Sequence, residues 1–253
     1  MPETLQIRIH GAASSPTLIY FPGLHGDWTL VGGFRQALAG RVRFVEFTYP
    51  RTLTWSLDDY AAEIEKALAE NGIAKGWLLG ESFGSQVVWP LLERGRFQVQ
   101  GIILAGGFVR HPINRGVRFA EWIAGGIPLA LITRVLFGYA SWARIRFRRS
   151  PETLAGIQEF IARRTELDRR AATHRLRLIA RSDHCSIARN ASVPVYALTG
   201  FFDPIVPWWW VRPWLKRNCP NLREFKILWR ADHTVLGTAA QAAAEQVVHW
   251  MTD

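Results

Sequence analysis

The 253-residue sequence contains only two cysteines, Cys185 and Cys219, so no framework of disulfides holds this chain together. Its longest apolar run, residues 122–133, is interrupted by glycine and proline and is too short for a transmembrane helix. Residues 1–10 lack both the apolar core and the small-residue cleavage site of a secretion signal. These absences predict a cytoplasmic protein without a transmembrane segment.

Motifs that hold common cofactors are missing as well. The sequence has no Gly-x-x-x-x-Gly-Lys-Ser/Thr phosphate loop, no Gly-x-Gly-x-x-Gly dinucleotide fingerprint and no His-Glu-x-x-His zinc motif. It also has no internal repeat and no low-complexity tract. We therefore expect no cofactor and no metal site.

Negative charge is scarce in one part of the chain. Residues 109–190 hold sixteen Arg, no Lys and six acidic residues, a net charge of +10. The whole chain also carries +10, so the remainder is neutral. A charge confined to one segment argues against nucleic-acid binding by the whole protein and for a local basic surface.

The sequence does contain a regular alternation of short apolar runs and amphipathic stretches. Apolar runs closed by glycine or proline predict buried strands, whereas the stretch from Ser56 to Asn71-Gly72 has the start and stop signals of a helix. Strands that alternate with helices favour an α/β fold with a mainly parallel sheet. The predicted strands are residues 5–9, 17–21, 42–47, 76–80, 99–105, 195–199 and 225–229, and further helices are predicted at 83–93, 208–217 and 238–250.

This alternation lapses between residues 110 and 189, where the sequence is rich in arginine and helical in texture. We interpret residues 1–108 and 191–253 as one α/β core, and residues 109–190 as an Arg-rich helical cap inserted into it. One helix of the cap is indicated by Pro151, Glu152 and the spacing of Leu154, Ile157, Phe160 and Ile161.

Gly80-Glu81-Ser82-Phe83-Gly84 is a Gly-x-Ser-x-Gly pentad between a predicted strand and a predicted helix. In such a turn the serine adopts a strained backbone conformation that lifts its hydroxyl clear of the sheet, and the glycines avoid side-chain clashes. The start of the following helix favours negative charge that develops nearby. Chance alone supplies such a pentad in about one in ten chains of this length, so the flanking strand and helix carry the prediction of a nucleophile.

The pentad in this setting resembles the nucleophile elbow of the α/β-hydrolase superfamily, especially its compact esterases and thioesterases. The resemblance implies an α/β-hydrolase fold over nearly the whole chain, in the order oxyanion loop, elbow, cap, acid loop and histidine loop. It also implies a catalytic triad in the chain order Ser, then Asp or Glu, then His, with Ser82 as the nucleophile.

His233 follows the last predicted strand on a short loop, where the resemblance places the base that activates the serine. Asp203 follows the strand before it, on a loop stiffened by Pro204 and Pro207, and is the predicted acid that orients the histidine. Asp232 is the rival carboxylate, but residues adjacent in sequence seldom bring their side chains face to face.

Two backbone N–H groups are expected to form the oxyanion hole of such an enzyme. The resemblance implies one from Phe83, directly after the nucleophile. Many relatives place a His-Gly pair before the second donor, and here Pro22-Gly23 takes that position, which favours Leu24. A His-Gly pair two positions later blurs this register and leaves Asp27 open as the donor.

Four side chains are predicted to bind substrate. Trp28 follows the oxyanion loop and Trp208 follows the acid loop, and both places lie near the pocket rim in the family. Trp122 belongs to the apolar part of the cap. His25 either lines the site or only shapes its turn.

The cap also carries clustered arginines among its apolar residues. A charge run of this kind is either a solvated helical face or a docking surface for an anion, because arginine matches carboxylate and phosphate with a planar fork. Acyl carrier protein, coenzyme A, an anionic lipid surface or an acidic sugar ester would fit such a surface. The arginines are Arg144, Arg146, Arg148, Arg149, Arg163, Arg164, Arg169, Arg170, Arg175, Arg177 and Arg181.

The sequence as a whole predicts a serine hydrolase that cleaves a carboxylic ester or thioester through an acyl-enzyme intermediate. Two alternatives stay open: transfer of the acyl group to an acceptor other than water, and a hydrolase-like scaffold that only binds a ligand. A complete triad argues against the scaffold, because a binding protein does not need all three side chains.

Overall fold

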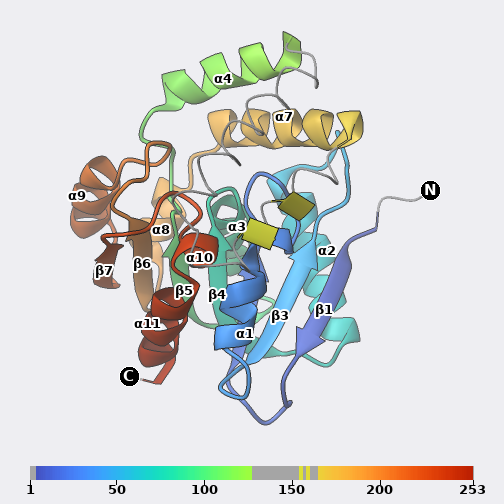
Figure 1. The fold of residues 1–253 in the computed structure, drawn as a ribbon, viewed down its shortest axis with the longest axis vertical. Coiled ribbons are helices and arrows are strands. Elements are labelled where there is room, and N and C mark those ends of the chain that lie inside the picture. Colours follow the sequence, from blue (N-terminus) through green and yellow to red (C-terminus); the bar gives the residue numbers. More distant parts are fainter. Residues whose placement is uncertain (1–3, 127–153, 156–157, 160–164, 253) are drawn as a thin grey trace.

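The computed structural model describes residues 4–126, 154–155, 158–159 and 165–252. Within these residues seven strands form one sheet in the order β1-β3-β2-β4-β5-β6-β7, and every neighbouring pair is parallel except β1 with β3 (Figure 1). This confirms the predicted mainly parallel sheet. The strands are β1 (Gln6–His10), β2 (Thr17–Phe21), β3 (Arg43–Thr48), β4 (Lys75–Glu81), β5 (Gln98–Ala105), β6 (Val195–Gly200) and β7 (Leu222–Leu228).

Helices cover both faces of the sheet, so the central strands are continuous apolar runs rather than alternating ones. In β2, for example, residues 18–21 are completely buried. One face packs against α1 (Gly32–Ala37), α10 (Val235–Thr238) and α11 (Ala240–Thr252). The other face packs against α2 (Leu57–Glu70), α3 (Gly84–Arg94), α8 (Cys185–Asn190) and α9 (Trp208–Asn218).

The helix ends follow from local sequence. Ser56 caps α2 through its side chain, which accepts a hydrogen bond from the backbone of Asp59, while the Asp59 carboxylate accepts from the backbone of Ser56. The closing helix predicted at residues 238–250 corresponds to α11, and the short α10 directly before it was not predicted. The helix α1 was not predicted, because it is short and begins with two glycines.

Two helices of the predicted cap lie between β5 and β6 in the chain. α4 (Asn114–Gly126) packs against α7 (Glu166–Arg181), and both lie over the C-terminal ends of the parallel strands (Figure 1). Most of the helix predicted near residues 151–161, and the second half of the apolar run 122–133, lie outside the described residues. Along the described chain, no helix has both the length and the apolar character needed to cross a bilayer.

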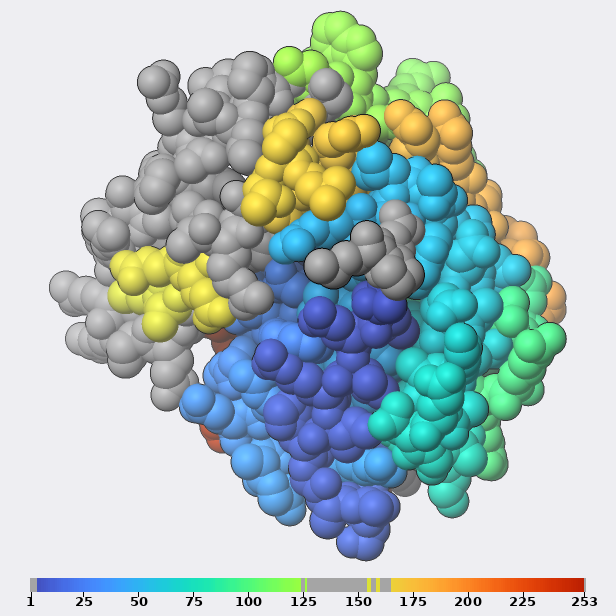
Figure 2. Space-filling view, turned by 90° about the vertical axis from the view of Figure 1, so that its right-hand side faces the viewer, coloured from blue at the N-terminus to red at the C-terminus, as the bar shows by residue number. Residues whose placement is uncertain are grey.

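The sheet has two edge strands, and each faces a different side of the molecule. Figure 2 shows the β1 edge (dark blue), with α4 (green) at the top of the same view. The opposite edge is β7, beside α9, at the left of Figure 1.

Candidate active site

The turn between β4 and α3 has the geometry of a strained elbow. Ser82 has a φ of +50°, and no other non-glycine residue of the described chain has a positive φ. Such a conformation costs a non-glycine residue about 1–2 kcal/mol. A Cβ atom added at Gly84 would overlap the carbonyl oxygen of Phe21, and one added at Gly80 would lie 2.8 Å from the backbone nitrogen of Ser85. The turn therefore needs glycine on both sides of the serine.

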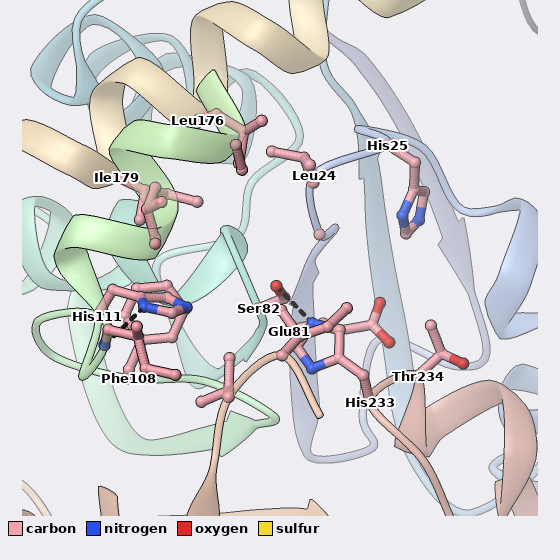
Figure 3. A pocket seen from close by; sticks show the side chains of 17 residues that line it. Leu24, His25, Glu81, Ser82, Phe108, His111, Leu176, Ile179, His233 and Thr234 are labelled. Atoms are coloured by element: carbon pink, nitrogen blue, oxygen red, sulfur yellow. Dashed lines mark hydrogen bonds between the residues drawn. The ribbon is translucent and has the colours of Figure 1, made fainter. Parts of the chain in front are cut away.

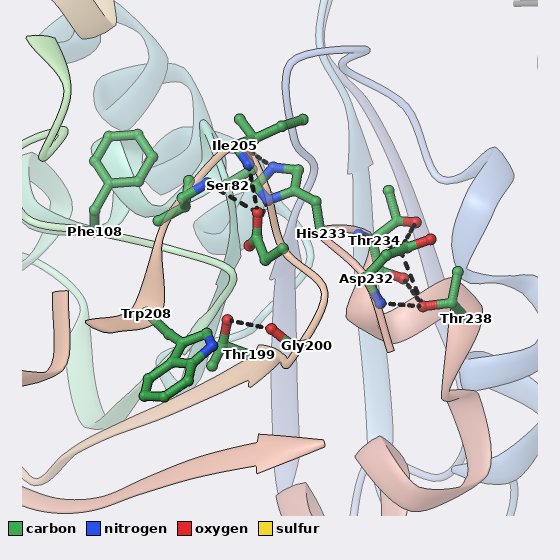
Figure 4. Close-up of polar contacts among 12 residues, drawn as sticks. Ser82, Phe108, Thr199, Gly200, Ile205, Trp208, Asp232, His233, Thr234 and Thr238 are labelled. Carbon is green, nitrogen blue, oxygen red and sulfur yellow. Dashed lines mark hydrogen bonds and ion pairs between the residues drawn. The ribbon is translucent and has the colours of Figure 1, made fainter. Parts of the chain in front are cut away.

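Three side chains far apart in sequence form one hydrogen-bonded chain at this elbow. The Nε2 atom of His233 lies 2.9 Å from Ser82 Oγ, and its Nδ1 atom lies 2.8 Å from Oδ2 of Asp203 (Figures 3 and 4). Because a carboxylate only accepts hydrogen bonds, Nδ1 carries the ring proton and Nε2 accepts the proton of the serine hydroxyl. The structure thus brings together all three residues of the predicted triad.

The carboxylate beside the histidine is held from two directions. Asp203 is buried, and its Oδ1 atom accepts hydrogen bonds from the backbone N–H groups of Ile205 (2.9 Å) and Val206 (2.8 Å), which leaves Oδ2 for the histidine (Figure 4). The rival Asp232 has another partner, because its Oδ1 accepts from the backbone and hydroxyl of Thr234 at the start of α10. The geometry therefore favours Asp203 as the acid.

Electrostatics favour a proton on the histidine. Burial alone would lower the pKa of His233, but the hydrogen bond and the negative charge of Asp203 outweigh it, and Glu81 and Asp232 add to their effect. The net result is a raised pKa. The carboxylates would thus stabilise an imidazolium if His233 took a proton.

A cavity of about 300 Å³ lies directly over the elbow, and Ser82 and His233 both line it (Figure 3). Its walls are mostly apolar and come from the core as well as from α4 and α7. An acyl chain or another apolar group would therefore meet a matching surface next to the serine hydroxyl. The apolar lining includes Leu24, Phe108, Val117, Leu176, Ile179 and Ile205.

The loop after β2 runs close to the nucleophile. A Cβ atom added at Gly23 would lie 3.5 Å from Cβ of Ser82, and Leu24 lines the cavity. The loop turns sharply, because the N–H of Gly26 donates to the carbonyl of Gly23 at 3.0 Å. Leu24, the favoured oxyanion donor, therefore lies beside Ser82.

The other oxyanion candidates are also placed by the structure. Phe83 is fully buried and directly precedes α3, next to the nucleophile. Asp27 does not line the cavity, and its carboxylate accepts a hydrogen bond from the backbone of Thr29. Of the two candidates for the second donor, only Leu24 lines the cavity.

An arginine of α7 holds this loop in place. Arg175, on α7, is buried and donates to the carbonyl oxygens of Leu24 (3.0 Å) and Pro50 (3.1 Å). Gly26 makes room for it, because a Cβ atom there would lie 2.5 Å from Nη1 of Arg175. Arg175 was expected in an exposed cluster for anions. Instead it connects α7 to the loop that carries Leu24.

Two further titratable side chains line the cavity and were not predicted. Glu81 is buried, accepts a hydrogen bond from the hydroxyl of Tyr20 at 2.5 Å, and has its pKa raised by burial to about 6. His111 accepts the N–H of Ile113 on Nδ1, and burial, together with the nearby His233, lowers its pKa to about 4. His111 is therefore neutral at pH 7. The position of Glu81 within the pentad was the signal available in the sequence.

Of the predicted substrate-binding residues, His25 and Trp28 lie in different surroundings. His25 lines the cavity, which agrees with the first of its two interpretations. Trp28 does not, because it packs into the core on the α1 and α11 side of the sheet, with the guanidinium of Arg8 3.8 Å from its ring centroid.

The other two tryptophans also lie away from the cavity lining. Trp122 is 75% exposed on α4 and stacks on Phe119, with ring centroids 6.0 Å apart. Trp208 begins α9, and its indole N–H donates to the carbonyl of Phe201 at 3.3 Å. Apolar side chains of other types form the walls instead.

Several arginines of the predicted docking cluster are already paired. Arg169 pairs with Glu166 one turn earlier on α7, and Arg177 pairs with Glu121 on α4 at 2.8 Å. These ion pairs reduce the positive charge that α4 and α7 present to solvent. Arg144, Arg146, Arg148, Arg149, Arg163 and Arg164 lie outside the described residues.

Comparisons with known proteins identify the fold. No family model matches the chain, and no curated protein sequence matches it significantly. Solved structures do match.

An enol-lactonase from Burkholderia xenovorans has a TM-score of 0.79 at 17% identity, covering 98% of this chain and 96% of that one. A thermophilic esterase from Thermogutta terrifontis has 0.75 at 19% identity, covering 98% and 93%. A hydrolase from Pseudomonas aeruginosa has 0.80 at 14% identity, covering 98% and 94%. The chain therefore has the α/β-hydrolase fold, as its pentad predicted.

Proposed function

We propose that this protein is a serine hydrolase that cleaves a carboxylic ester or thioester through an acyl-enzyme intermediate. The observation that carries the proposal is the chain of hydrogen bonds from Asp203 through His233 to Ser82, which ends at an apolar cavity. The names of the fold neighbours, an enol-lactonase and an esterase, agree with this class of reaction.

In the proposed reaction the Oγ atom of Ser82 attacks the carbonyl carbon while Nε2 of His233 takes the hydroxyl proton. The negative charge on the carbonyl oxygen is stabilised by the backbone N–H groups of Leu24 and Phe83. His233 then protonates the departing alcohol or thiol. Water then attacks the acyl carbon while His233 takes one of its protons, and His233 returns that proton to Oγ of Ser82 as the bond to the acyl group breaks and the acid leaves.

The cavity suggests the type of acyl group. Its volume of about 300 Å³ is at the lower end of the range for ligand pockets. Its walls are mostly apolar, and buried Glu81 would disfavour a carboxylate close to the serine. We therefore propose a short, uncharged acyl chain as the group transferred to Ser82.

The proposal is tested with a series of p-nitrophenyl esters of increasing chain length. We expect the wild type to be most active on short chains, and Ser82→Ala to lose at least about 10⁴-fold in kcat. A fluorophosphonate probe should label the wild type and not Ser82→Ala. Esterase activity that survives in Ser82→Ala would refute the proposal, and a wild type that neither turns over esters nor takes the label would be a binding scaffold.

A matched pair of carboxylates tests the acid. Asp203→Asn removes the acceptor of the His233 ring proton, and by analogy with other triads it should lower kcat by about 10²–10⁴-fold. Asp232→Asn changes a carboxylate that bonds to Thr234 rather than to the ring, so kcat should stay within about threefold. Equal losses in the two variants would contradict the assignment of Asp203.

A further inference from the structure

A second surface next to the cavity is not explained by ester hydrolysis in water. Four large aromatic side chains, Phe202, Trp209, Trp210 and Trp229, are about half exposed or more, the greatest being Trp229 at 68%. All follow the C-terminal ends of β6 and β7, on the acid loop, on α9, or directly after the edge strand. We refer to these four residues as the aromatic face. Clustered exposed aromatics of this kind mark a site of interaction.

Three of the four exposed rings, Phe202, Trp209 and Trp229, are linked through the partly buried rings of Phe201 and Trp208. Phe201 stacks on Trp229 with ring centroids 4.6 Å apart and meets Phe202 edge-on at 5.1 Å. On its other side it approaches Trp208 at 5.9 Å, and Trp208 meets Trp209 edge-on at 5.7 Å. Phe201 and Trp208 thus form a support that holds the exposed rings in position.

Positive charge borders these rings. Residues 201–230 contain six Arg or Lys and only two acidic residues. Both acids are engaged: Asp203 is buried in the triad, and Glu224 accepts a hydrogen bond from the indole of Trp250 at 2.7 Å. No described carboxylate forms an ion pair with the exposed side chains of Lys216, Arg217, Arg223 or Lys226.

On α9 the two kinds of side chain share one helical face. Trp209 and Lys216 are seven residues apart, as are Trp210 and Arg217, so each pair points in nearly the same direction. Val211 is buried against the core on the opposite side. The outward face of α9 therefore carries indole rings in its first turn and cations in its last.

The aromatic face adjoins the cavity. Ile205, on the same loop as Phe202, lines the cavity and is 54% exposed. On the other side of the cavity, Gly116 and Ala120 of α4 are exposed and also line it. The exposed part of the lining thus belongs to α4 and to the acid loop, and Phe202 of the aromatic face lies on that same loop.

We propose that the aromatic face, with the cations that flank it, docks this protein on an anionic lipid bilayer. Tryptophan favours the headgroup region of a membrane, and each nearby lysine or arginine adds attraction to anionic lipids. The bilayer, rather than an acidic protein, fits the combination of protruding rings and cations on one helix face. Docking would let an apolar ester pass from the membrane to the cavity over Ile205 without crossing water.

This inference deepens the proposed function by naming the source of its substrate. It differs from a role for the cap arginines, because the residues concerned lie between positions 201 and 230. Docking itself needs no catalysis, so it is measured in a Ser82→Ala background. A negative result for vesicle binding is then independent of a negative result for hydrolysis.

The test measures binding to vesicles of phosphatidylcholine alone, or mixed with phosphatidylglycerol, by flotation. We expect binding to the anionic vesicles that weakens with salt. Replacing Trp209 and Trp229 by serine should weaken it about tenfold or more, because exposed rings of this size bury a large apolar area. Reversing the charges of Lys216 and Arg217 to glutamate should weaken it about fivefold for each unit of charge.

Control variants carry equal changes elsewhere. Trp122→Ser removes an indole that is 75% exposed on α4, and Lys66→Glu with Arg96→Glu reverses two exposed charges on other parts of the core. We expect both controls to bind within about twofold of the parent. Failure to bind either vesicle, or an equal loss in the controls, would overturn the inference, and binding only to an acidic protein would do the same.

A soluble ester separates this inference from the proposed function. With Ser82 restored, the aromatic and charge variants should hydrolyse p-nitrophenyl butyrate at the parental rate, because none of the four substituted residues lines the cavity. Hydrolysis without vesicle binding would leave the proposed function standing and remove the docking surface. Vesicle binding without hydrolysis would leave the docking surface standing and remove the proposed function.

Discussion

The contact between Gly26 and Arg175 gives a prediction whose size follows from the structure. Gly26 has a φ of +82°, and a Cβ atom there would lie 2.5–2.7 Å from three atoms of the buried Arg175 guanidinium. Gly26→Ala should therefore lose about 1–2 kcal/mol from backbone strain and a further 1–3 kcal/mol or so from overpacking. The expected total, about 2–5 kcal/mol, is a large part of the stability of an ordinary domain.

A matched glycine separates these two costs. Gly40 has a similar φ of +75°, but a Cβ atom there would meet nothing within 4 Å. Gly40→Ala should thus lose only the strain, about 1–2 kcal/mol. The difference between the two alanine variants, measured from urea unfolding curves at constant slope, is the steric part.

A double-mutant cycle tests whether Arg175 is the cause. Arg175→Ala is itself destabilising, because it leaves the carbonyls of Leu24 and Pro50 without their donor. In that background, however, Gly26→Ala should lose only the backbone strain, so the double variant is more stable than the sum of the single effects by about 1–3 kcal/mol. Additive effects, within about 0.5 kcal/mol, would refute the reasoning.

Two other predictions concern titration. The neutral form of His233 is the proposed base, and the pKa of this histidine is raised, so kcat/KM should fall as the pH drops through that raised value. Glu81→Gln removes one of the charges that raise the pKa of His233, so it should move this acid limb of the pH–rate profile to lower pH. An unchanged limb would exclude Glu81 as an influence on His233. Burial, helped by Asp183, raises the pKa of the Cys185 thiol to about 11, so only about one thiol in a thousand is ionised at pH 8. Iodoacetamide should therefore modify Cys185 slowly at that pH, without loss of activity, as followed by mass spectrometry.

The strands and the elbow could be predicted because their signals are local. A buried run such as residues 17–21, closed by Pro22-Gly23, is apolar on both faces wherever helices cover both sides of a sheet. Through its resemblance to the nucleophile elbow, the Ser82 pentad also predicts the chain order of the other two residues, Asp203 and then His233. Each of these residues follows a strand, and parallel strands end at the same edge of the sheet.

Residues whose role depends on distant packing could not be predicted in this way. Arg175 belongs to a run of arginines with similar sequence surroundings, and only the approach of α7 to the loop at Leu24 buries it. The positions of Trp28 and Trp122 could not be predicted from the sequence for the same reason. One is in the core and the other faces solvent, because the hydrophobicity of an indole does not say which surface will cover it.

The positive φ of Ser82 has a practical consequence for capturing a substrate. Alanine, the usual replacement for a nucleophile, would keep the strained backbone, whereas Ser82→Gly would remove both the hydroxyl and the strain. The glycine variant would then be an inert receptor that folds at least as stably as the parent, with the cavity walls and the oxyanion loop unaltered. Soaked with candidate esters, such a receptor would hold its ligand uncleaved long enough for the bound molecule to be identified.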